Sequence, residues 1–202
     1  MLSHLDGRRV LLGVTGSIAA YKSPDIVRRL KEQGADVRVV MTASAEKLVA
    51  PTVFHAVSGE PVRGDIWDAE AEASMGHIEL AKWADLILIA PATANTIAQL
   101  ASGSAESLLA TLVLASDAQI YIAASMNQAM WSDPATQANV EKLKARKVQF
   151  IGPDSGSQAC GDVGPGRMTE PQDIVGFLLT GGAPGPLAGL HVMVTAGPVS
   201  YT

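Results

Sequence analysis

Small polar side chains gather in three turns of this 202-residue chain, each directly after a run with the composition of a buried strand. The turns contain Gly16-Ser17-Ile18, Thr42-Ala43-Ser44 and Thr93-Ala94-Asn95-Thr96. Hydroxyl and amide groups can hydrogen-bond a ligand, and small side chains let a flat ligand approach the backbone. Each turn alone could simply be a helix cap, because Ser, Thr and Asn are common caps. Three such turns in one sheet favour a single shared ligand.

The first of these turns has the character of a phosphate site. It runs from a strand through Gly13 and Gly16 to Ser17, where a helix is expected to begin. Backbone N–H groups at a helix start attract anions, and Ser17 adds a hydroxyl. The alternative is a tight strand-to-helix turn without a ligand. The spacing matches neither G-x-G-x-x-G nor G-x-x-x-x-G-K-[ST], so the usual dinucleotide and nucleoside-triphosphate fingerprints are missing.

Two further side chains are candidates for acid–base or carboxylate chemistry. His77 follows Gly76 at an expected helix start, and an imidazole near neutral pH can act as a base or hold a carboxylate. A structural role for this histidine is the alternative. Asn127, which follows Ser125 and Met126 after a predicted strand, offers both a donor and an acceptor to a carboxylate or amide. No group of His, Cys, Asp and Glu has metal-ligand spacing, so no metal is predicted.

Residues 152–168 form a long glycine-rich segment with little material for packing. Such segments inside compact domains are usually lids or disordered. This one carries the single cysteine, Cys160, and Arg167, which makes it a candidate catalytic lid. The alternative is a loop with an incidental thiol.

Alternating strand and helix patterns must position these residues. Strands are predicted at residues 10–15, 37–41, 85–90, 120–124 and 148–151, and helices at about 17–33, 134–146 and 171–179, with another capped by Ser44. Pro24 either kinks the first helix or, with Ser23 as its cap, begins a second stretch. The alternation predicts an α/β fold with a parallel sheet covered on both faces. Ligands of such folds bind at the carboxyl ends of the strands.

Composition further limits the classes of protein to which the chain can belong and the partners it can have. The net charge is -5 and no basic run occurs, which argues against nucleic acid. Charged residues make up only 17%, and this points to a homo-oligomer with buried interfaces. One cysteine excludes an intrachain disulfide and suits the cytoplasm. No apolar run is long enough for a membrane span.

Taken together, these motifs resemble the homo-oligomeric flavin-containing cysteine decarboxylases. The segment ending Gly166-Arg167-Met168 is most similar to the lid of the phosphopantothenoylcysteine decarboxylases. The resemblance covers about residues 7–180 and implies a Rossmann-like, flavodoxin-type fold, bound FMN and a homotrimer or dodecamer with FMN near a subunit interface. The FMN-binding domain is expected to comprise residues 1–180. Residues 181–190 are expected to be a linker, and 191–202 to be the truncated start of a synthetase domain.

The resemblance also implies roles for individual residues. His77 and Cys160 match catalytic positions, Cys160 as the proton donor. Substrate-binding positions are matched by Asn127, Ser157, Gly166, Arg167 and Met168. Flavin-contact positions are matched by Gly16, Ser17, Ile18, Thr42, Ser44, Thr93, Asn95, Thr96 and Ser125.

The implied reaction turns 4′-phosphopantothenoylcysteine into 4′-phosphopantetheine in coenzyme A biosynthesis. It proceeds by oxidation of the thiol side, loss of CO2 and re-reduction of the ene-thiolate, with FMN as the hydride carrier. Three alternatives are a peptidyl-cysteine decarboxylase, a flavin prenyltransferase, and a non-enzymatic regulatory subunit that keeps the flavin fold. The prenyltransferase would leave His77, Asn127 and Cys160 without roles.

Overall fold

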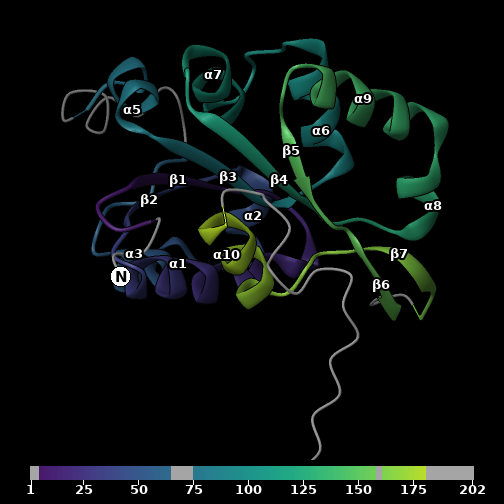
Figure 1. The fold of residues 1–202 in the computed structure, drawn as a ribbon, viewed down its shortest axis with the longest axis horizontal. Coiled ribbons are helices and arrows are strands. Elements are labelled where there is room, and N and C mark those ends of the chain that lie inside the picture. Colours follow the sequence, from purple (N-terminus) through teal and green to yellow (C-terminus); the bar gives the residue numbers. More distant parts are fainter. Residues whose placement is uncertain (1–4, 65–74, 158–160, 181–202) are drawn as a thin grey trace, which may run out of the picture.

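A parallel sheet forms the centre of the fold (Figure 1). The computed structural model describes residues 5–64, 75–157 and 161–180. Its five-stranded sheet has the order β2-β1-β3-β4-β5 and consists of β1 (Arg9–Val14), β2 (Asp36–Met41), β3 (Leu86–Ala92), β4 (Gln119–Ala124) and β5 (Gln149–Ile151). All five predicted strands are present, with ends shifted by one or two residues.

Helices cover both faces of this sheet, which confirms the predicted α/β class (Figure 1). One face carries α1 (Ser23–Glu32), α3 (Pro51–Ser58) and α10 (Pro171–Leu179). The other carries α5 (His77–Trp83), α6 (Ala94–Ser102), α7 (Leu108–Ala115) and α9 (Pro134–Ala145). The described part of the chain also contains three short helices, η1 (Ile18–Lys22), α2 (Ala43–Glu46) and α8 (Gln128–Ser132).

The core consists of two apolar clusters, one on each side of the sheet. Successive side chains of a strand point to opposite faces, so Leu11 packs beneath α5–α9 while Leu12 packs beneath α1 and α10. Both are fully buried, as expected of a parallel sheet with two covered faces. On the helix side, Ile26 and Leu30 of α1 lie one turn apart and face the sheet together.

The strand order places a ligand crevice between β1 and β3. The chain passes from β1 to β2 on one side and from β3 to β4 on the other, so the connections leave these two strands in opposite directions. In open parallel sheets such a switch point is where ligands bind, at the carboxyl ends of the strands. The turns after Val14 and Ala92 lie there.

The local predictions for the first two helices need correction. Of the two alternatives for residues 17–33, the second is confirmed in outline, because η1 is followed by a separate helix, α1, with Pro24 in its first turn. Ser23 is the first residue of α1 and not its N-cap, and its buried hydroxyl donates to the carbonyl of Ala90 at 2.8 Å. Ser44 does not cap α2 either. Thr42 does, by accepting a hydrogen bond from the backbone N–H of Ala45.

The glycine-rich segment forms a two-stranded antiparallel hairpin, β6 (Asp154–Ser157) and β7 (Val163–Arg167). The backbone N–H of Met126 donates to the carbonyl of Gly166 at 2.9 Å, which ties β7 to the turn after β4. Cys160 lies outside the described residues, as do the expected linker and synthetase start. In the part of the chain that is described, no helix is both long and apolar enough to cross a membrane.

Candidate functional site

Thr15 joins the turns that follow β1 and β3. Its hydroxyl donates to the carbonyl of Pro91 at 2.8 Å and accepts from the backbone N–H of Thr93 at 3.1 Å. The residue is 1% exposed, so these bonds form away from water. Because both neighbouring turns are held by one side chain, their positions relative to each other are set by the fold.

The turns after β1 and β2 also approach closely. A methyl group on Gly16 would lie 2.4 Å from Cβ of Ser44, well inside van der Waals contact. Glycine at this position is therefore required by the distance between the two turns.

These turns enclose a cavity of about 550 Å³, here called the turn cavity. It is lined by Thr15, Gly16, Ser17, Thr42, Ala43, Ser44, Thr93, Ala94, Asn95, Thr96, Gln99, Ser107, Ser125, Met126 and Met130. Eight of the nine residues matched to flavin contacts are among them, and Ile18 lies in the adjoining cavity. Among the described residues that line the turn cavity, none is charged.

The capping and ligand-binding interpretations of these turns are compatible. Thr42, Thr93 and Ser107 each cap a helix by accepting a backbone N–H, and each also lines the turn cavity. A hydroxyl that caps a helix keeps its remaining hydrogen-bonding capacity for a second partner. The caps therefore hold the hydroxyls still at the cavity wall.

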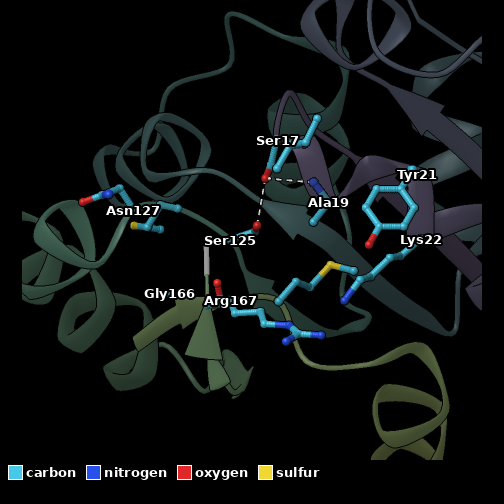
Figure 2. Close-up of a pocket in the computed structure, with 12 residues that line it drawn as sticks. Ser17, Ala19, Tyr21, Lys22, Ser125, Asn127, Gly166 and Arg167 are labelled. Atoms are coloured by element: carbon cyan, nitrogen blue, oxygen red, sulfur yellow. Dashed lines mark hydrogen bonds between the residues drawn. The ribbon is translucent and has the colours of Figure 1, made fainter. Parts of the chain in front are cut away.

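A second cavity of about 590 Å³, the hairpin cavity, adjoins the first and shares Ser17, Ser125 and Met126 with it. Its other lining residues are Ile18, Ala19, Tyr21, Lys22, Asn127, Ser157, Gly166, Arg167 and Met168. All five residues matched to substrate binding are among these. Figure 2 shows the hydroxyls of Ser17 and Ser125 meeting between the two sides of this cavity, at 2.7 Å.

Asn127 already holds a carboxylate in this structure. Its Oδ1 accepts the backbone N–H of Ala129 and caps α8, while its Nδ2 donates to a carboxylate oxygen of Asp162 at 2.8 Å. The cap orients the amide so that its NH2 group faces the hairpin. Asp162 carries the same chemical group as a substrate carboxylate, so the amide of Asn127 has the orientation that binding a carboxylate requires.

Two positively charged side chains and one carboxylate lie close together at another part of the hairpin cavity. Nζ of Lys22 and a guanidinium nitrogen of Arg167 both donate to Oε1 of Glu170, at 2.7 and 2.6 Å. The hydrogen bond from Lys22, followed in weight by that from Arg167, lowers the pKa of Glu170 against the opposing effect of burial. Glu170 is therefore ionised near neutral pH.

His77 is not brought to either cavity of the single chain. It is the first residue of α5, directly after the N-cap Gly76 as expected, and it is half-buried. Arg63 donates to the carbonyl of Met75 at 2.7 Å and Arg38 stacks on the ring of Trp83 at 4.5 Å, so both ends of α5 are held. The described residues contain no trio of His, Cys, Asp or Glu placed to hold a metal ion.

Several lining residues have no counterpart in the sequence-based predictions: Thr15, Tyr21, Lys22, Gln99, Ser107 and Met130. For Thr15 a signal exists, since a threonine directly after an apolar strand begins the first turn. Lys22 gives no such signal, because a single lysine in a helical stretch is most often a solvent-exposed charge. Its place in the cavity depends on the short η1 helix.

The fold and the two joined cavities define a flavodoxin-like α/β protein with its ligand site at the β1/β3 switch point. A family model described as Flavoprotein matches residues 1–180, and the chain belongs to that family. A flavin is therefore the class of cofactor for this site.

Comparison with individual proteins narrows the relationship. The chain is 53% identical over 194 residues to the coenzyme A biosynthesis bifunctional protein CoaBC of Vibrio vulnificus (strain YJ016), covering 96% of this chain and 48% of that protein. It therefore spans about half the length of such relatives. Among solved structures, a mutant PPC decarboxylase complexed with pantothenoylaminoethenethiol superposes with a TM-score of 0.75 at 32% identity, covering 85% of this chain and 96% of that one. The FMN-dependent cysteine decarboxylase SpaF gives a TM-score of 0.74 at 34% identity, covering 88% and 98%.

Proposed function

We propose that this chain is an FMN-dependent decarboxylase that converts 4′-phosphopantothenoylcysteine to 4′-phosphopantetheine in coenzyme A biosynthesis. The observation that carries the proposal is the pair of joined cavities, in which an uncharged pocket of small polar turns opens into one where Asn127 holds a carboxylate. Similarity to the bifunctional CoaBC proteins and to PPC decarboxylase supports the same reaction.

The turn cavity suits FMN. Its hydroxyl and amide side chains, among them Ser44, Asn95 and Thr96, can bond the ribityl chain, the phosphate and the ring edge of a flavin. Gly16 keeps the first two turns within a distance that no side chain would allow. When bound, FMN supplies the electron sink that cysteine decarboxylation requires, by accepting a hydride from the substrate and later returning it.

The residues of the chain itself bind the substrate and supply the proton for the last step. Asn127 binds the carboxylate of the cysteine moiety and orients the bond that breaks when CO2 leaves. Ser157 and the end of β7 bound the space around the substrate. Cys160 supplies the proton in the final reduction, and His77 acts as an acid–base group from a neighbouring copy in a homotrimer or dodecamer. The enzyme is expected in the cytoplasm.

A peptidyl-cysteine decarboxylase is the second candidate. SpaF, an FMN-dependent cysteine decarboxylase, shares the fold at a similar identity, so the group that carries the cysteine has to be settled by experiment. The two candidates differ in substrate. One accepts a phosphorylated pantothenoyl chain and the other the carboxyl-terminal cysteine of a peptide.

The experiment is direct. Protein purified without added cofactor should be yellow, release FMN on denaturation and liberate CO2 from 4′-phosphopantothenoylcysteine but not from a cysteine-terminated peptide. Cys160→Ser serves as the control for chemistry: a serine hydroxyl is a far weaker acid than a thiol of pKa about 8.5, so CO2 loss should continue while the ene-thiol accumulates by mass. Colourless protein that does not take up FMN, or turnover of the peptide alone, would refute the proposal.

A further inference from the structure

The cluster of Lys22, Arg167 and Glu170 joins three elements at the wall of the hairpin cavity. Lys22 is the last residue of η1, Arg167 is the last of β7, and Glu170 is the N-cap of α10. Both cations donate to the same carboxylate oxygen. Two positive charges against one negative charge leave one positive charge uncompensated within the cluster.

The charge faces a confined space. The side chain of Lys22 is only 11% exposed, so its ammonium group has lost most of its water. A lysine ammonium has three N–H donors and a guanidinium has five, and each is seen to spend one on Glu170. Both groups therefore keep donors for an anionic ligand, and hydrogen bonds between charged groups are the strong ones.

The position of the cluster distinguishes the two ends of the cavity. In Figure 2, Asn127 lies at one side of the hairpin cavity, while Lys22 and Tyr21 lie at the other and the guanidinium of Arg167 points towards Lys22. Within the described parts of the chain, the charged residues that line the two cavities are Lys22 and Arg167. A ligand with a carboxylate at Asn127 and a second anionic group at its far end fits this distribution.

We infer that Lys22 and Arg167, oriented by Glu170, bind the phosphate of the substrate and make the enzyme selective for a phosphorylated pantothenoyl chain. The inference rests on the proposed function, since it names the residues that would choose that substrate over an uncharged analogue or a peptide. The phosphate of FMN is a second source of the same chemistry, and a purely structural tie between η1, β7 and α10 is the remaining explanation.

The test compares two substrates, 4′-phosphopantothenoylcysteine and pantothenoylcysteine, which differ only in the phosphate. In Lys22→Gln, the ratio of their kcat/KM values should fall roughly 10- to 100-fold from the wild-type ratio, the usual effect of losing a hydrogen bond between charged groups. Lys144→Gln is the matched control, because Lys144 also pairs with a glutamate, on the exposed surface of α9. Its ratio should equal that of the wild type.

A second variant separates phosphate binding from structural support. Glu170→Gln removes the competing negative charge but keeps a side-chain oxygen that can accept from both cations. The cations therefore stay oriented, and the preference for the phosphorylated substrate should hold or rise. A structural tie would instead make Lys22→Gln and Glu170→Gln behave alike and lower both kcat/KM values together, which would overturn the inference.

Two binding measurements complete the design and do not depend on turnover. Calorimetry with 4′-phosphopantothenate and pantothenate should show the same loss of preference in Lys22→Gln. FMN and riboflavin should bind this variant as they bind the wild type. Selective loss of FMN would assign the cluster to the flavin phosphate and overturn the inference. Absence of CO2 release by the wild type would refute the proposed function, and the calorimetric result would still decide the role of Lys22.

Discussion

Asn127 performs two tasks with the two ends of one amide. Its oxygen caps α8 and its nitrogen donates to the carboxylate of Asp162. The cap explains why the amide cannot turn, since reversing it would place an NH2 group against the N–H of Ala129. A site for a carboxylate is thereby built into the start of a helix.

Replacing Asn127 with Asp separates these tasks. Asp caps a helix as well as Asn does, so the fold and bound flavin should persist. The donor, however, becomes a second negative charge facing the carboxylate, and KM for 4′-phosphopantothenoylcysteine should rise at least roughly 10-fold. Steady-state kinetics with flavin absorbance measures both effects. Asn139→Asp, the same change within α9, is the control. An unchanged KM would remove Asn127 from the substrate site.

The sequence identified residues of the cavities where a polar side chain stands directly after a predicted strand. Ser17, Thr42 and Thr93 could be identified because hydroxyls directly after apolar strands are visible in the sequence. Lys22 could not, because nothing local separates a cavity lysine from a surface one. The side chain is recruited only when β7 and α10, far away in the chain, close against η1.

At the level of elements, the five strands of the parallel sheet were predictable to within two residues, since short, mostly apolar runs leave few alternatives. For the first helix the sequence left two alternatives, a kink at Pro24 or a second stretch beginning at Ser23, and the local residues could not decide between them. The hairpin β6–β7 was missed as well. Its Gly- and Ser-rich strands show no alternation of apolar and polar residues, and long-range contacts such as that of Met126 with Gly166 hold it.

The connection between β1 and β3 through Thr15 can be tested in isolation. Thr15→Val keeps the shape of the side chain but leaves the partly buried N–H of Thr93 without this acceptor. An unsatisfied buried group costs about 1–3 kcal/mol, and the free energy of unfolding in urea should fall by that amount. Retention of flavin should fall too, because the turn at Thr93 lines the turn cavity. Thr136→Val in α9 is the control and should cost less than about 0.5 kcal/mol. Equal losses in both variants would contradict this assignment.

At the scale of the whole molecule, the exposed apolar side chains of the described residues include two groups on different parts of the fold. Ile18, Tyr21 and Val163 are 64%, 66% and 71% exposed around the hairpin cavity. Ile78 and Leu114, which are 44% and 52% exposed, belong to α5 and α7 near His77. Two different patches on one chain suit a head-to-tail contact, which closes into a ring when the rotation permits. Such a trimer would set His77 of one copy against the cavities of the next.

A mixed assembly tests this arrangement. His77→Asn should be nearly inactive alone, since a positioned acid–base group contributes roughly 10²–10⁴-fold. Asn127→Asp alone should turn over little substrate at concentrations well below its raised KM. In trimeric rings that contain both variants, about one interface in three should pair an intact His77 with an intact Asn127. Co-expression with two different tags, tandem purification and CO2 assay measure the outcome. If each chain used its own His77, no site in the mixture would be intact. Recovery of activity in the mixed rings therefore requires that neighbouring copies share the site. Mixtures as inactive as their parents would mean that His77 acts in its own chain or takes no part in the reaction.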